Sequence, residues 1–149
     1  MALTVQEVIA ARTEEAFRDL FASARRMPAD KLDWQPLGDG RTALDQLREC
    51  ATAPSFYRSV LTSEPLENLR EVRKGWDIDE CERRGIVATE HLTQTIRSLS
   101  AESLATRIEV PKNGTLPVLD VVWMHLANLT YHLGAINYIQ TLYGDLEME

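Results

Sequence analysis

The sequence predicts an all-α protein: an up-and-down four-helix bundle with a short hairpin or extended loop before its last helix. Four segments carry apolar residues at helical spacing, and capping signals or proline and glycine breakers bound them. Only one short stretch alternates polar and apolar residues in the manner of a strand. Helices of this number and length pack most simply as a bundle, and the 149 residues are expected to form one domain, 1–149.

The first predicted helix runs from about residue 5 to residue 27. Thr4 and Glu7 form a capping-box signature at its start, and Pro28 ends it. Prolines and glycines then predict a loop over 28–40.

The second predicted helix begins after Thr42, which forms another capping-box signature with Asp45. Pro54 lies inside its apolar pattern, so we expect a kink or a break near Ala53. Residues 63–74 form a charged connection with little periodicity.

The third predicted helix covers about 77–99. Residues 107–110 alternate in polarity, and an Asn-Gly pair at 113–114 is a tight-turn signal, which predicts a hairpin or an extended loop. Pro117 suits the first turn of the last helix, which should end near Tyr143.

Composition and charge exclude several classes of protein. Hydrophobic residues make up 44% and charged residues 26%, as in soluble globular domains. The net charge of −7 argues against a nucleic-acid surface, no apolar run is long enough for a transmembrane helix, and no signal peptide is expected. Cys50 and Cys81 fall in helical patterns, which indicates small core residues in a reducing cytoplasm and not a disulfide framework.

The last helix places polar side chains inside its apolar stripe. At 100° per residue, His125, Asn128 and His132 fall within an arc of roughly 60°. Buried polar groups need partners, which here are other side chains, water or a metal ion. His125 therefore is either a core histidine bonded to a carbonyl or side chain, or a ligand, and His132 has the same two interpretations.

A metal site in a bundle needs ligands from facing helices. His125, Asn128 and His132 have suitable spacing, but a neutral amide such as Asn128 is a poor ligand for zinc or nickel. Glu49 is the candidate carboxylate on the second helix. Taken alone it resembles a solvated surface residue, because it points more than about 100° from the centre of that helix's apolar stripe.

Three stretches of the chain resemble the DinB/YfiT-like superfamily of four-helix-bundle proteins. The first is residues 32–36, leading into 41–47 at the start of the second helix, and the second is the pattern of the third helix. The third and most specific is 128–140, which is similar to the family's segment H-x-x-x-H-x-G-Q-[IL]. Together these stretches cover nearly the whole chain.

The resemblance implies a divalent metal, zinc, nickel or iron, held by three histidines of the family pattern. Carried over by position, these ligands fall on Glu49, Asn128 and His132, of which only His132 keeps the imidazole, while Ala135 replaces the family's glutamine. His125 is then expected to orient a ligand or to replace one. The site is therefore expected to have lost part of its nitrogen ligand set.

The resemblance also implies a function. Characterised members include metal-dependent thiol transferases and hydrolases that act on small molecules, so a metal-dependent enzyme of this kind, or a descendant of one, is expected. The rival hypothesis is a non-catalytic dimeric binding or assembly module with a polar core. In both cases we expect a cytoplasmic homodimer without nucleic-acid or membrane partners, and Trp123 and Met124 lie off the buried stripe of the last helix.

Overall fold

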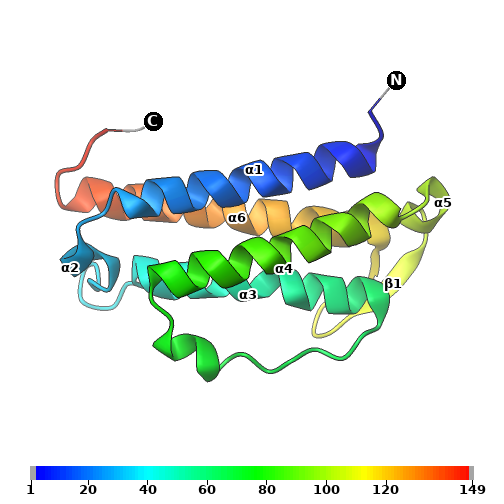
Figure 1. The fold of residues 1–149 in the computed structure, drawn as a ribbon, viewed down its shortest axis with the longest axis horizontal. Helices are drawn as coiled ribbons and strands as arrows, with labels where there is room; N and C mark the ends of the chain where they lie inside the picture. Colours follow the sequence, from blue (N-terminus) through cyan, green and yellow to red (C-terminus); the bar gives the residue numbers. More distant parts are fainter. Residues whose placement is uncertain (1–2, 148–149) are drawn as a thin grey trace.

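The computed structural model describes residues 3–147 and contains four long helices packed side by side (Figure 1). The long helices are α1 (Val5–Arg25), α3 (Ala43–Thr62), α4 (Ile78–Ser98) and α6 (Val118–Leu142). The short elements are α2 (Ala29–Leu32), the 3-10 helix η1 (Val72–Gly75), α5 (Ala101–Leu104), β1 (Arg107–Val110) and β2 (Gly114–Pro117). The prediction of an all-α four-helix bundle with a hairpin before the last helix is confirmed.

The long helices begin where local capping signals lie. The Thr4 hydroxyl accepts a hydrogen bond from the backbone N–H of Glu7 at 3.2 Å, and the Thr42 hydroxyl accepts one from Asp45 at 3.0 Å. Asp77 caps α4 in the same way. Each cap satisfies a backbone donor that the first helical turn leaves without a partner.

Pro54 does not break the second long helix. α3 runs without interruption from Ala43 to Thr62, and Pro54 is buried within it. Proline removes one backbone hydrogen bond from a helix. Because α3 packs against both α4 and α6, tertiary contacts hold the helix together at this position.

The hairpin between α5 and α6 is a true antiparallel pair. Arg107 of β1 lies opposite Pro117 of β2, and Val110 lies opposite Gly114. Gly114 has a φ of 73°, in the left-handed region that glycine adopts without strain. The Asn-Gly signal therefore marked the turn correctly.

The directions of the four helices do not strictly alternate, which differs from the up-and-down order that the sequence predicted. α1 and α6 run one way, whereas α3 and α4 both run the other way (Figure 1). The connection over 63–77 makes this possible by returning along the outside of the bundle from the end of α3 to the start of α4. An extended residue advances about 3.3 Å and a helical residue 1.5 Å, so this connection is long enough to span the 20 residues of α3.

The packing order places the helix with Glu49 against the helix with His132. α3 contacts α4 and α6, and α1 contacts the same two helices from the other side. The α3–α6 pair is antiparallel, with Gln46 beside His132 and Tyr57 beside His125. The polar residues of α6 thus face α3.

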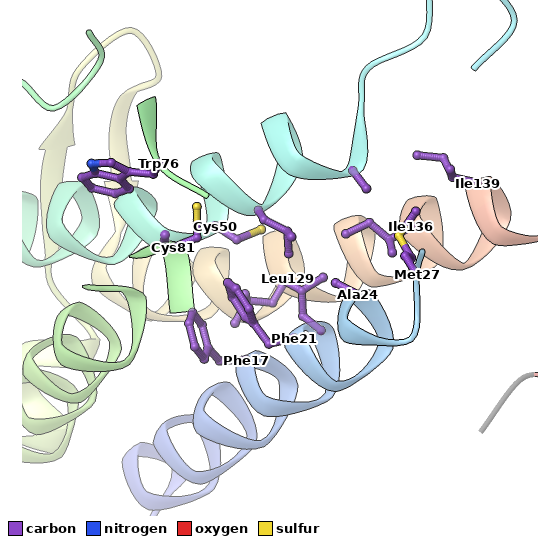
Figure 2. Packing of buried hydrophobic residues seen from close by; sticks show 14 residues of the cluster. Phe17, Phe21, Ala24, Met27, Cys50, Trp76, Cys81, Leu129, Ile136 and Ile139 are labelled. Atoms are coloured by element: carbon purple, nitrogen blue, oxygen red, sulfur yellow. The ribbon is translucent and has the colours of Figure 1, made fainter. Parts of the chain in front are cut away.

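The core between the helices is mostly apolar. Phe17 and Phe21 of α1 pack together with a centroid separation of 4.7 Å, and Leu129 of α6 lies beside them (Figure 2). Cys50 and Cys81 lie where α3 meets α4 (Figure 2).

No helix formed by residues 3–147 is both long and apolar enough to cross a membrane.

Candidate functional site

His132 of α6 is buried and is held by two side chains of α3. Its Nδ1 lies 2.8 Å from Oε1 of Gln46, and its Nε2 lies 3.2 Å from Oε1 of Glu49. An ionised carboxylate can only accept a hydrogen bond, so Nε2 donates the proton in the Glu49 pair. The two contacts fix the plane of the imidazole and direct Nε2 toward the carboxylate.

Glu49 lies at the margin between α3 and α6, with its side chain one-third exposed. Its Oε1 also accepts from Nδ2 of Asn128 at 3.4 Å, and its Oε2 accepts from Nη2 of Arg41 at 2.8 Å. The hydrogen bond from His132, together with that from Arg41, lowers the pKa of Glu49 to about 2 against the opposing effect of burial. The carboxylate is therefore ionised at neutral pH.

The structure brings together the three residues that the family resemblance selected. Glu49, Asn128 and His132 form one group, which we call the polar cluster, with Gln46 and Arg41 as its supports. The helical period directs Glu49 away from the core stripe of α3. The residue still reaches His132 because α6 packs beside that edge of α3.

His125 is buried close to the polar cluster but is not bonded to it. Neither ring nitrogen has a hydrogen-bond partner among residues 3–147, and the ring lies 5.8 Å from that of Tyr57. Burial, with a smaller effect of His132, lowers the pKa of His125 to about 3, so its ring is neutral at physiological pH. His125 is thus a core histidine, but without the hydrogen bond expected of one, and it does not orient His132 through a hydrogen bond.

A cleft of about 430 Å³ opens beside the polar cluster. Glu49 and Asn128 are among the residues that line it. The cleft continues between α3 and the connection over 63–77, which supplies Leu66 to Arg70 and also Arg73. The side chain of Glu49 can therefore be reached by a small molecule in this cleft.

The two cysteines do not provide a reactive thiolate. Burial raises the pKa of Cys50 far above its usual value and raises the pKa of Cys81 to about 12. The Sγ of Cys50 lies 3.9 Å from Oδ1 of Asn128, at the inner side of the cluster. Both thiols remain protonated and act as small core groups, as the sequence predicted.

The polar cluster offers two atoms that are good ligands for a divalent metal. Ligands about 2.0–2.2 Å from one zinc ion, at angles near 90–110°, lie about 3.0–3.5 Å apart. The 3.2 Å between Nε2 of His132 and Oε1 of Glu49 falls in this range. Asn128 directs its Nδ2, a donor, toward Glu49, and no group of three His, Cys, Asp or Glu side chains suited to a metal exists within residues 3–147.

Gln46, Arg41 and Arg73 are site residues that the sequence did not single out. Gln46, Glu49 and Thr52 recur at three-residue spacing along one side of α3, beside its apolar stripe. Such a polar row could have indicated a second packed face on this helix. The position of Arg73 has no sequence signal, because it depends on the path of the connection over 63–77.

The fold and the polar cluster define a four-helix-bundle protein with a glutamate–histidine pair at the edge of a cleft. The chain belongs to the DinB superfamily, whose family model matches residues 12–136. No curated protein sequence shows significant similarity to it.

One solved structure with a similar fold is YfiT from Bacillus subtilis, which is described as a probable metal-dependent hydrolase with an unusual four-helix bundle topology. The two chains are 14% identical, and the superposition has a TM-score of 0.74. It covers 96% of this chain and 91% of YfiT. At this identity the similarity establishes the fold alone.

Proposed function

We propose that this protein is a metal-dependent enzyme of the hydrolase or thiol-transferase type, with a reduced ligand set, that acts on a small molecule in the cleft. The observation that carries the proposal is the 3.2 Å pair of Glu49 and His132, of which Glu49 lines a cleft of about 430 Å³. YfiT, which has a similar fold, is described as a probable metal-dependent hydrolase, and this description also supports the proposal.

In this proposal Glu49 and His132 hold a divalent ion of zinc, nickel or iron. A bound divalent ion supplies Lewis-acid polarisation of a substrate and lowers the pKa of a bound water or thiol. Gln46 fixes the imidazole through Nδ1, leaving Nε2 for the metal, and Arg41 holds the second oxygen of Glu49. Asn128 becomes a weak third ligand only when its amide turns Oδ1 away from Cys50 and toward the ion.

A proton competes with the metal for this site. Nε2 of His132 donates to Glu49, so a metal must displace that proton before it binds. Zinc and nickel prefer imidazole to an amide oxygen, and this chain has one imidazole where the family pattern has three. We therefore expect weak or partial metal occupancy.

The second candidate function is a non-catalytic binding or assembly module. It is favoured by one specific observation: both oxygens of Glu49 already accept hydrogen bonds from His132, Asn128 and Arg41. A fully paired carboxylate is also what a purely structural polar cluster requires.

Metal titration by calorimetry separates the two functions. The proteins are the full chain without an affinity tag, the variant His132→Asn, and the double variant Glu49→His with Asn128→His. We expect weak zinc or nickel binding by the native chain and none by His132→Asn. In the double variant we expect affinity at least about tenfold higher, because two imidazoles are restored at existing ligand positions.

The matched control is His91→Asn, which removes the exposed histidine of α4 and should leave the titration unchanged. Native binding as tight as that of the double variant would mean that the native residues are a complete ligand set. Absence of binding by the native chain, with unchanged thermal stability in the presence of metal, would favour the binding module.

A further inference from the structure

Part of the cleft wall carries positive charge. Arg70 and Arg73, both from the connection over 63–77, are among the residues that line the cleft. No acidic side chain among residues 3–147 forms an ion pair with either guanidinium. The positive charges of these two guanidinium groups are thus not neutralised by a carboxylate of the described residues.

Arg73 is positioned by α3. Its Nη1 donates to Oγ1 of Thr52 at 2.8 Å, and the Thr52 hydroxyl in turn donates to the backbone carbonyl of Arg48 at 3.0 Å. The side chain of Arg73 is half-buried, whereas Arg70 is exposed at the rim. A guanidinium carries five N–H donors, so Arg73 keeps four after its bond to Thr52. A fixed, partly desolvated guanidinium with free donors is suited to a planar oxyanion.

Other walls of the cleft are largely apolar. Phe56 and Tyr57, which follow Thr52 on α3, line the cleft together with Leu66 and Leu69 of the connection over 63–77. Glu67 also lies on the rim, where it is exposed. Its negative charge disfavours an anion at the mouth. Glu49 is ionised too, but its ion pair with Arg41 offsets that charge, so the half-buried guanidinium of Arg73 is the better anion partner.

The spacing limits the length of a ligand that contacts both Arg73 and Glu49. Thr52, which positions Arg73, lies three residues after Glu49 on α3. Three helical residues correspond to about 4.5 Å along the axis. One ligand can therefore place an anionic group on Arg73 and a second group against Glu49 when only a few bonds separate the two groups.

We propose that the cleft binds a small organic oxyanion, a carboxylate or a phosphate ester on an apolar body. The oxyanion pairs with the free donors of Arg73, and the body lies against Phe56 and Tyr57. This rests on the proposed function only in treating the molecule as the substrate whose reacting group lies at Glu49, since the anion contact itself requires no metal.

The test is calorimetric titration of the full chain, freed of metal by a chelator, with phenylacetate, phenyl phosphate and the neutral phenylacetamide. We expect at least one anion to bind, and the amide to bind at least about tenfold more weakly because it lacks the charge. The stronger of the two anions identifies the oxyanion. Equal binding of the amide and both anions, or no binding of either anion, would overturn the proposal.

Variants assign the anion contact to Arg73. Arg73→Gln should weaken binding of the preferred anion at least about tenfold, and Arg73→Lys should recover part of the loss because it keeps the charge without the planar fork. Thr52→Val, which leaves the guanidinium but removes its support, should give an intermediate loss. Arg18→Gln, an exposed arginine of α1, is the matched control and should bind as the native chain does.

Unchanged binding by Arg73→Gln would also overturn the proposal. The metal titration remains a separate measurement, because Arg73 contacts Thr52 and not the polar cluster. Anion binding without metal binding would support this inference and oppose the proposed enzyme. Metal binding without anion binding would support the proposed enzyme and overturn this inference.

Discussion

His125 is the residue at which α6 departs most from ordinary core packing. Its imidazole is fully buried, yet neither nitrogen has a hydrogen-bond partner among residues 3–147. An unpartnered buried polar group costs roughly 1–3 kcal/mol of stability. His125 therefore reduces the stability of the bundle and contributes no hydrogen bond to the polar cluster.

We predict that His125→Leu stabilises the protein by about 1–2 kcal/mol at neutral pH, because leucine has a similar volume and no polar atoms to desolvate. Urea unfolding followed by circular dichroism measures the change. His91→Asn, at an exposed histidine, is the control and should alter the free energy of unfolding little. A His125→Leu protein less stable than the native chain would show that the ring has a partner in solution.

The same substitution should reduce the sensitivity of the fold to acid. The unfolded chain protonates His125 near its ordinary pKa of 6.5, whereas the folded protein does so only near about 3. The unfolded state thus binds an extra proton between these values, and native stability falls as the pH drops from 6.5 toward 3.

We therefore predict that the stability advantage of His125→Leu grows as the pH falls below 6.5, by at most about 1.4 kcal/mol per pH unit. Urea unfolding at several pH values between 7.5 and 4.5 tests this. An advantage that stays constant over this range would contradict the assignment of a lowered pKa to His125.

At the scale of elements, the approach of α4 to α1 and α3 depends on Gly85. A Cβ added there would lie 2.5 Å from Cζ of Phe17 and 3.2 Å from the Cα of Ala51. The ring of Phe17 is itself packed against Phe21, which restricts its movement. The absence of a side chain at Gly85 is what lets the three helices pack this closely.

We predict that Gly85→Ala destabilises the bundle by about 1–3 kcal/mol, because overpacking outweighs the gain of about 1 kcal/mol in helix propensity. Gly134→Ala is the matched control. Gly134 lies within α6 with nothing within 4 Å of an added Cβ, so it should show the propensity gain alone. Urea unfolding of both variants measures the contrast, and stabilisation by both would refute the packing role of Gly85.

The capping residues could be predicted because capping is local. Thr4 and Thr42 satisfy donors within three residues of themselves, so the sequence around each contains all that the interaction needs. Pro54 shows the limit of such reasoning. Its local effect favours a kink or a break, but α3, packed on two helices, is one continuous helix.

At the scale of the whole molecule, α6 exposes more apolar surface than a helix of a monomer needs. Trp123 is 51% exposed, and Leu119, Tyr131 and Tyr138 are exposed along the same helix. Met124, the other residue expected to lie off the buried stripe, is half-buried beside Trp123. Surfaces of this kind are typical of protein–protein contacts.

We predict a symmetric dimer formed through α6 and the adjoining part of α1. Light scattering at micromolar concentration should give twice the mass of the chain, and Trp123→Glu should shift the protein to a monomer. Val87→Glu, at an exposed position of α4, is the control and should remain dimeric. A native protein that is monomeric at every concentration would exclude this dimer.

The sequence by itself determined the four helices, their starting residues, the hairpin turn and the polar face of α6. These features follow from helical period, capping and turn chemistry, which act over a few neighbouring residues. The selection of Glu49, Asn128 and His132 came from the family resemblance, because the period of α3 alone placed Glu49 in solvent.

Only the tertiary structure decided the helix directions and the partners in the site. The parallel course of α3 and α4 depends on the path of the connection over 63–77, which also brings Arg73 to the cleft. Gln46 meets His132, and His125 is left without a partner, because of how α3 packs against α6. These outcomes depend on contacts between distant segments, and local patterns do not specify such contacts.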